Sequence, residues 1–226
     1  LVQNELVSLR LMRAAGVPVI TSSACRLVEG VFETPRYDRV GDRRSSITRL
    51  HQEDFCQATG RRPYAKYESR GGPSLGDIRI LIQKHSADPL TDVEIVARWA
   101  AANAVIGNSD GHAKNLSFLH TSDGLRLAPV YDVVCTEAYE FLGKNLAISI
   151  GGRPNLASID DTAIDEFART FLLNRGTARD LMDEVVGSIS NSLDDVIHDV
   201  ETDVGSHQVL QRIQSLVKAK CTDWFA

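Results

Sequence analysis

Apolar residues recur every three or four positions in several long stretches of the chain, which is the spacing of a helix with one buried face. The pattern predicts a helix over 4–15 that turns Leu6, Leu9 and Met12 inward. Gly16 follows it and is a typical residue after a helix end. The run from 156 to 220 has the same spacing and predicts helices with breaks near Gly176 and Gly205.

Two further helices begin at recognisable caps. Ser74 precedes a helix whose apolar face carries Ile78. Thr91 and Glu94 have the spacing of a capping box, which predicts Thr91 as the N-cap of a helix that ends at Gly107. Apolar residues cover much of the circumference of this helix, so we expect it to be the central buried one.

Shorter apolar runs predict strands and turns between the helices. Strands are expected over 24–28, 31–34 and 146–150, and a hairpin over 116–128 that turns at Ser122, Asp123 and Gly124. Residues 51–60 predict a short helix. The whole pattern predicts an α+β fold that is mainly helical.

Composition narrows the class of protein. A chain of 226 residues can bury a substantial core in one domain or two subdomains. Its net charge of −5 argues against a general nucleic-acid binder. No apolar run approaches the roughly 20 residues of a membrane span, and the four cysteines form no CxxC pair, so we expect a cytoplasmic protein with reduced thiols and no zinc site. The acidic stretch from 160 to 203 is expected to form solvated helix faces.

The stretch 108–115, Asn-Ser-Asp-Gly-His-Ala-Lys-Asn, carries the candidate chemistry. Four residues separate Asp110 from Asn115, which is the Asp-to-Asn spacing of a protein-kinase catalytic loop. The predicted hairpin would return Asp132 to the side of Asn115. Phosphoryl transfer needs a carboxylate near the attacking hydroxyl and hard oxygen ligands for Mg²⁺, and these three residues could supply both.

Plainer interpretations of the same residues stay open. Asn, Ser, Asp and Gly also crowd together in ordinary turns. Glu5 is either a capping residue or a helix glutamate that faces the nucleotide site. The segment 35–39 is either a loop that leaves the strands or a kinase hinge, in which backbone groups near Tyr37 bind adenine and Asp38 binds the ribose.

Taken together, these motifs resemble the HipA-like serine/threonine kinases, the toxin component of bacterial toxin–antitoxin modules. The loop at 108–115 is also similar to the catalytic loop of phosphatidylinositol 3/4-kinases. The matching segments, in the family's order, are 4–5, 36–39, 53–57, 66–68, 71–73, 108–115, 129–132 and 146–152.

The resemblance implies a role for each matching site residue. Asp110 would be the catalytic base, and Asn115 and Asp132 would hold Mg²⁺. The backbone around Tyr37 would bind the adenine of ATP. The remaining nucleotide contacts would come from Asp38 and His112 at the ribose and from Lys114, which is either a phosphate contact or a solvated side chain.

The resemblance also implies a protein-kinase-like fold, related to HipA and the phosphatidylinositol kinases, and a division of the chain. Residues 1–37 would be the end of the N-terminal lobe and the hinge, and 38–226 the helical C-terminal lobe with its catalytic and metal-binding loops at 108–132. Because the family's phosphate-binding segment lies before the point matching Leu1, we expect the chain to be a fragment.

The expected activity is ATP-dependent phosphorylation of a protein on serine or threonine. Family members phosphorylate an aminoacyl-tRNA synthetase, which makes such a synthetase a candidate substrate. The expected partner is an antitoxin of the HipB type, with DNA bound only through it and no membrane. Two alternatives stay open: a catalytically incompetent lobe that docks the antitoxin, and a kinase of lipids or small molecules.

Overall fold

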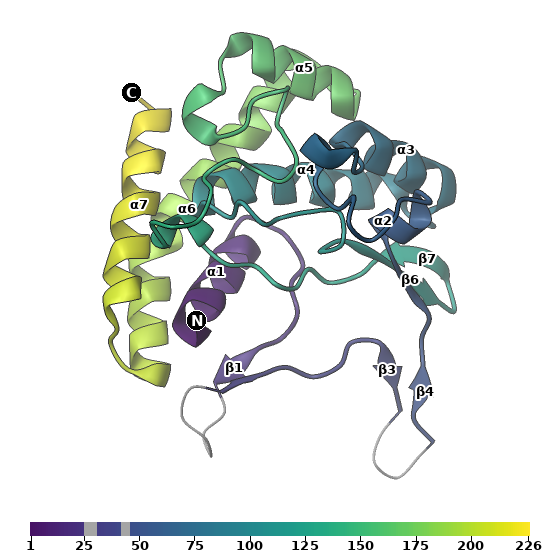
Figure 1. The fold of residues 1–226 in the computed structure, drawn as a ribbon, viewed down its shortest axis with the longest axis horizontal. Coiled ribbons are helices and arrows are strands. Elements are labelled where there is room, and N and C mark those ends of the chain that lie inside the picture. Colours follow the sequence, from purple (N-terminus) through teal and green to yellow (C-terminus); the bar gives the residue numbers. More distant parts are fainter. Residues whose placement is uncertain (25–30, 42–45) are drawn as a thin grey trace.

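The computed structural model describes residues 1–24, 31–41 and 46–226 (Figure 1). Helices built around α4 (Pro89–Ile106) form most of it, and the second half of α4 is almost wholly buried. The predicted central helix is therefore confirmed. The helices in contact with α4 are α1 (Val2–Ala14), α3 (Leu75–His85), α6 (Arg175–Val204) and α7 (Gln208–Trp224).

The start of α4 differs from the prediction. The helix begins at Pro89, and the side chain of Asp88 accepts a hydrogen bond from the backbone N–H of Thr91. Thr91 therefore lies inside the first turn, and the predicted capping box at Thr91 was wrong. Proline suits the first helical position because its φ is already helical and its missing N–H has no partner there.

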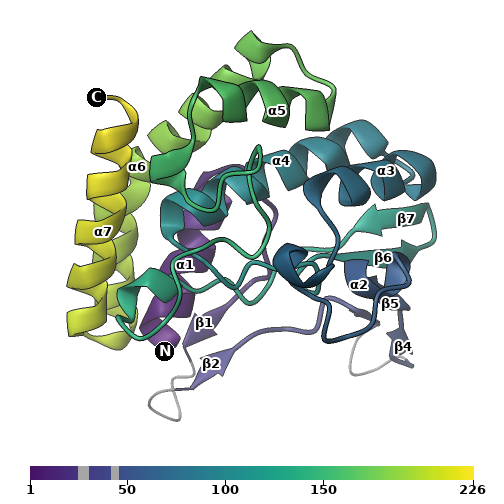
Figure 2. The ribbon, with the colours of Figure 1, turned by 45° about the horizontal axis from the view of Figure 1, so that its top comes forward.

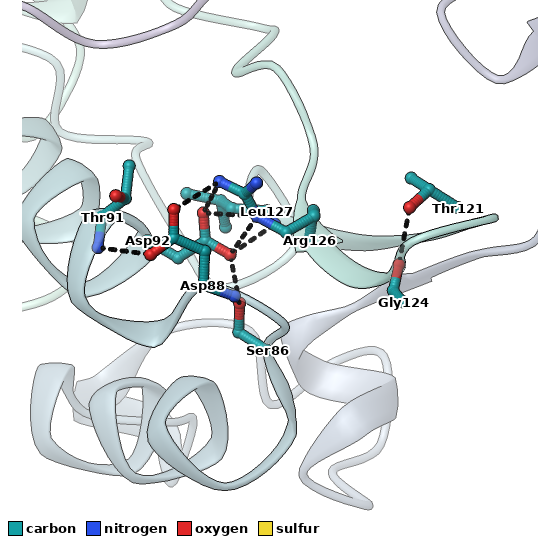
Figure 3. A network of polar contacts seen from close by, with 8 residues as sticks. All are labelled: Ser86, Asp88, Thr91, Asp92, Thr121, Gly124, Arg126 and Leu127. Carbon is teal, nitrogen blue, oxygen red and sulfur yellow. Dashed lines mark hydrogen bonds and ion pairs between the residues drawn. The ribbon is translucent and has the colours of Figure 1, made fainter.

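Asp92 fastens this end of α4 to the sheet (Figure 3). Its side chain is 1% exposed and accepts hydrogen bonds from the guanidinium of Arg126 at 3.1 Å and from the backbone N–H of Leu127 at 3.0 Å. Ser86 adds a third hydrogen bond through its hydroxyl. A buried carboxylate needs such partners, so this network fixes the sheet against the central helix.

The sheet has three antiparallel strands in the order β5-β6-β7 and lies beside α2 at the end of the molecule away from α7 (Figure 2). Its strands are β5 (Gln52–Asp54), β6 (Ser117–Thr121) and β7 (Gly124–Leu127). The predicted hairpin is confirmed, with Thr121 paired to Gly124 across the turn. The helix predicted over 51–60 is wrong in its first half, because β5 pairs there with β6 and only α2 (Phe55–Ala58) is helical.

Two short ribbons precede the sheet in the chain. β1 (Ser23–Ala24) pairs with β2 (Phe32–Glu33), and β3 (Arg39–Val40) pairs with β4 (Thr48–Arg49). The described parts of the predicted strands over 24–28 and 31–34 thus pair as expected, while 25–28 lie outside the described residues.

The strand predicted over 146–150 is wrong. The segment bends back on itself, with hydrogen bonds from the backbone N–H of Leu146 to the carbonyl of Pro154 and between Ile150 and Arg153. The bend passes very close to a helix, since a Cβ on Gly151 would lie 2.2 Å from the carbonyl oxygen of Ala163. Ile148 and Ile150 are buried in the main hydrophobic core of the protein, although they lie in a loop.

The chain ends in helices, as predicted for 156–220. α5 (Asp161–Phe171) stops at Leu172, which has a left-handed backbone, and Asn174 caps α6, so this break lies before the predicted Gly176. The second break is at Gly205. Single 3-10 turns lie at Glu68–Arg70 (η1), Thr136–Ala138 (η2) and Leu156–Ser158 (η3). Within the described ranges, no helix combines the length and the apolar character that a membrane crossing requires.

Candidate active site

The predicted catalytic loop connects the end of α4 to β6. Gly107 ends α4 with a left-handed backbone, and the amide of Asn108 donates a hydrogen bond to Asn103 in the helix. The side-chain oxygen of Asn108 accepts a hydrogen bond from the backbone N–H of Asp110 at 3.1 Å. Gly111 packs so closely that a Cβ would lie 2.8 Å from the Asn103 amide. These contacts fix the loop on a rigid helix.

Asp110, the predicted base, lies at the opening of this loop with its side chain 50% exposed. Its Oδ1 accepts a hydrogen bond from the hydroxyl of Tyr67 at 2.5 Å, and the same oxygen is 3.7 Å from the ammonium of Lys66. Both partners precede η1. A cavity of about 470 Å³ adjoins Asp110, with Tyr67, Arg70 and Thr136 among its lining residues.

His112 lies deeper in the loop and is 5% exposed. Its Nε2 is 2.7 Å from the ammonium of Lys66, and its Nδ1 is buried without a hydrogen-bond partner among the described residues. Burial lowers the pKa of His112, the charge of Asp110 raises it, and Lys66 lowers it again. The imidazole is therefore neutral at pH 7, and contact with a ribose would require Lys66 to release Nε2.

Asn115 and Asp132, the predicted metal ligands, are in contact. Asn115 accepts the backbone N–H of His112 on its Oδ1 and donates from Nδ2 to Asp132 Oδ2, each at 2.9 Å. The predicted return of the hairpin to Asn115 is thus confirmed. Asp132 has a φ of 57°, a left-handed conformation that aspartate and asparagine tolerate better than most residues.

Helix α1 holds the loop that follows Asp132. Asn4 is fully buried, and its amide donates to the carbonyl of Cys135 at 3.0 Å while its oxygen accepts the Cys135 N–H at 2.8 Å. Sequence reasoning missed this role, although a polar residue on the apolar face of a helix is a signal for such a contact. On the same helix, burial and then the charge of Asp132 raise the pKa of Glu5.

The oxygen atoms of Asp132 and Asn115 are suitable ligands for Mg²⁺. The aspartate is exposed, and no hydrogen bond from a described residue reaches its second oxygen. Asn115 adds an amide oxygen, and Mg²⁺ favours one or two such hard oxygen ligands together with phosphate oxygens and water. Among the residues with described positions, no three His, Cys, Asp or Glu side chains gather into a metal-binding cluster.

Tyr37 and Asp38 line a neighbouring cavity of about 270 Å³, which also includes Gln52 and Tyr131. The Tyr37 hydroxyl donates to Gln52 at 2.7 Å, and its ring stacks on that of Tyr131 with centroids 6.2 Å apart. Tyr131, which lines this cavity, directly precedes Asp132 in the chain. Burial also raises the pKa of the Tyr37 phenol.

Asp38 is 2% exposed and is held by two arginines. Arg36 donates to both of its oxygens, at 2.8 and 2.7 Å, and Arg39 approaches one of them at 2.5 Å. These hydrogen bonds, that of Arg36 foremost, lower the pKa of Asp38 to about 2. Lys114, the last predicted contact, is half-buried, and its carbonyl accepts a hydrogen bond from Tyr131.

Comparison with known proteins identifies the family. The model of the HipA-like C-terminal domain matches residues 1–193. The chain belongs to this family. Y4mE of Sinorhizobium fredii, whose name describes it as an inferred kinase, is 38% identical to this chain over 200 residues. These residues cover 87% of this chain and 47% of Y4mE. The serine/threonine-protein kinase toxin HipA of Shewanella oneidensis is 31% identical over 166 residues, which cover 66% of this chain and 37% of the toxin.

Solved structures agree on the fold of this HipA-like domain. HipA of Shewanella oneidensis MR-1, solved with HipB and its operator DNA, matches with a TM-score of 0.84 and 24% sequence identity. The match covers 100% of this chain and 56% of the HipA chain. The Helicobacter pylori proinflammatory kinase CtkA matches with a TM-score of 0.58 and 12% identity, over 97% of this chain and 82% of its own. The fold is therefore kinase-like. The chain spans about half the length of its HipA-like relatives.

Proposed function

We propose that the protein containing this HipA-like domain is an ATP-dependent serine/threonine protein kinase and the toxin of a bacterial toxin–antitoxin system. The contact between Asn115 and Asp132, beside a loop that presents Asp110, carries the proposal. Kinases need a carboxylate at the attacking hydroxyl and oxygen ligands beside it, and this site offers both. The names of the two relatives support the same activity.

In the proposed reaction, a serine or threonine hydroxyl of the substrate attacks the γ-phosphorus of ATP. The new P–O bond forms as the bond from the γ-phosphorus to the bridging oxygen breaks, and ADP leaves. Asp110 orients the hydroxyl and takes its proton. Asn115 and Asp132 would hold Mg²⁺, which would offset the negative charge of the phosphates when bound.

The nucleotide would lie across the cavity at 35–39. Backbone groups around Tyr37 would bind adenine, and Asp38 would bind the ribose if Arg36 and Arg39 leave room on its oxygens. His112 is the second candidate for the ribose and Lys114 the candidate for a phosphate. The stacked rings of Tyr37 and Tyr131 support an aromatic ligand here, because a flat base can pack against them.

The proposed partners follow from the relatives. One solved HipA is bound to HipB and operator DNA, so we infer an antitoxin of the HipB type for this protein, with DNA reached through it. The substrate would be a protein, with an aminoacyl-tRNA synthetase as a candidate, and the site of action the cytoplasm. A lobe that docks the antitoxin without catalysis is the second candidate.

Transfer of labelled γ-phosphate in a lysate tests the activity. The full gene product should label protein rather than lipid or metabolite, and Asp110→Asn should reduce labelling by about 100-fold or more, as expected for the loss of a general base. The variant should keep its melting temperature, because Asn still accepts the Tyr67 hydrogen bond. Asp123→Asn, at the exposed hairpin tip, is the matched control. Undiminished transfer by Asp110→Asn would remove this residue from the base role.

A further inference from the structure

Lys66 and Tyr67 lie outside the catalytic loop, yet they contact two of its residues, Asp110 and His112. The ammonium of Lys66 is 2.7 Å from His112 Nε2 and 3.7 Å from Asp110 Oδ1. The Tyr67 hydroxyl reaches the same Asp110 oxygen at 2.5 Å. More than 40 positions separate each partner from the loop, so the fold itself creates this cluster.

The segment is held firmly in place. Its backbone bonds to the catalytic loop, from the Ala113 N–H to the Lys66 carbonyl, and to the loop at 147 through the Glu68 N–H. It then closes on itself at Gly72, whose N–H donates to the Tyr67 carbonyl at 2.9 Å. A Cβ on Gly72 would lie 2.7 Å from two backbone oxygens, so only glycine fits this closure without a shift of the backbone.

We propose that Lys66 and Tyr67 are positioning residues for Asp110, Tyr67 through its hydrogen bond and Lys66 through a positive charge that is anchored on His112. The inference rests on the proposed kinase function and adds a second group of residues to it. In the proposed reaction, neither Lys66 nor Tyr67 contacts ATP or the substrate.

The hydrogen bond of Tyr67 restricts the carboxylate of Asp110. With Oδ1 occupied, the carboxylate is held in one rotamer and Oδ2 is left for the substrate hydroxyl. A base oriented by a further group is a recurrent arrangement in enzymes, since misplacement by about 1 Å can cost about 100-fold in rate. Burial and the nearby Asp110 raise the pKa of Tyr67 to about 12, so the phenol remains a donor at physiological pH.

The contact of Lys66 with His112 fixes the histidine tautomer. An ammonium group has three donors and no acceptor, so Nε2 must accept and the proton of the neutral ring lies on Nδ1. The anchored ammonium then stays close to Asp110, where it offsets the negative charge that collects when ATP binds. In this arrangement His112 anchors the lysine through Nε2, which leaves Asp38 as the candidate ribose contact.

Steady-state kinetics of the full gene product test the proposal. Tyr67→Phe and Lys66→Met should each lower kcat by about tenfold or more, near 1.4 kcal/mol in the barrier, with KM for ATP within about twofold. Lys66→Arg should recover part of the loss because it keeps the charge. The controls are Tyr64→Phe and Lys84→Met, which change exposed residues elsewhere.

Three results would overturn the proposal: an unchanged kcat in Tyr67→Phe and Lys66→Met, a raised KM for ATP with kcat intact, or an arginine variant as inactive as the methionine variant. Tyr67→Phe removes a single oxygen atom, so it decides the matter even if a Lys66 variant fails to fold.

The histidine tautomer gives a readout that does not need kinase activity. Nitrogen-15 NMR of the His112 ring should find Nε2 unprotonated and Nδ1 protonated, and Lys66→Met should shift the ring toward protonation at Nε2. Protonation at Nε2 in the wild type would overturn the anchoring contact. Failure of the wild type to transfer phosphate, with the tautomer as expected, would count against the proposed kinase function instead.

Discussion

Asn115 donates a hydrogen bond from its side-chain amide to the carboxylate of Asp132 at 2.9 Å, although 17 positions separate the two residues. The hairpin β6-β7 brings the chain back to the catalytic loop, and Asn4 of α1 holds the segment that follows. The catalytic loop, the hairpin β6-β7 and helix α1 thus position the two candidate metal ligands together.

Asn4→Ala should destabilise the fold and the Asp132 loop together. The variant loses both side-chain hydrogen bonds to Cys135. The Cys135 carbonyl then keeps only the longer bond from the Ala138 N–H at 3.4 Å, while Ser8 still accepts from the Cys135 N–H. We expect the free energy of unfolding in urea to fall by about 1–3 kcal/mol. Gln3→Ala, on the neighbouring half-buried position, is the control. A change below about 0.5 kcal/mol would show that α1 does not hold this loop.

Asp92→Ala should separate the sheet from α4. The substitution leaves Arg126 and the Leu127 N–H without their buried acceptor, and removal of one partner from a buried ion pair costs about 3–5 kcal/mol. We expect about 3 kcal/mol, because Arg126 remains partly exposed to water. Asp88→Ala removes the helix cap and a longer, solvent-exposed ion pair with Arg126 at 3.6 Å, and should cost only about 1 kcal/mol. Equal losses in denaturant unfolding would contradict the assigned roles.

Glu5→Gln should stabilise the fold at neutral pH. Burial and the charge of Asp132 raise the pKa of Glu5 in the folded state, so its contribution to stability is full below the pKa of the unfolded chain and is lost as the pH rises through the folded value. The variant should therefore exceed the wild type in unfolding free energy at pH 7, and the gain should vanish near pH 4.

The same variant tests whether Glu5 faces Asp132. In an Asp132→Asn background the like charge is gone, so the stabilisation from Glu5→Gln at pH 7 should be smaller. An equal gain in both backgrounds would mean that burial alone acts on Glu5 and that it does not face the site.

The sequence predicts the parts of the fold that repeat with a period. The helices around α4 and the hairpin β6-β7 follow from long apolar patterns, and the contact of Asn115 with Asp132 follows from the hairpin. β5 has only three residues, too few for a period, and its strand form depends on pairing with β6. The segment 146–150 alternates like a strand but finds no strand to pair with among the described residues.

Contacts between distant segments explain what sequence reasoning missed at the site. The approach of Lys66 and Tyr67 to Asp110 depends on the tight closure at Gly72 and leaves no local pattern. The pairing of Asp38 with Arg36 is local and could have been anticipated from their spacing. The roles of Asp38 and His112 at a ribose stay predictions. The carboxylate of Asp38 accepts hydrogen bonds from Arg36, and Nε2 of His112 contacts Lys66. Nδ1 of His112 is buried without a partner among the described residues.

Binding of ATP to the full gene product, measured by calorimetry with and without Mg²⁺, tests the central proposal most directly. Asp132→Asn is the decisive variant, because asparagine tolerates the left-handed backbone at this position and removes only the charge. We predict that Mg²⁺ tightens ATP binding in the wild type and that the variant loses this gain, by about tenfold or 1.4 kcal/mol. The control Asp123→Asn should behave as the wild type. Equal Mg²⁺-dependent affinity in Asp132→Asn and the wild type would contradict the assignment of Asp132 as a metal ligand.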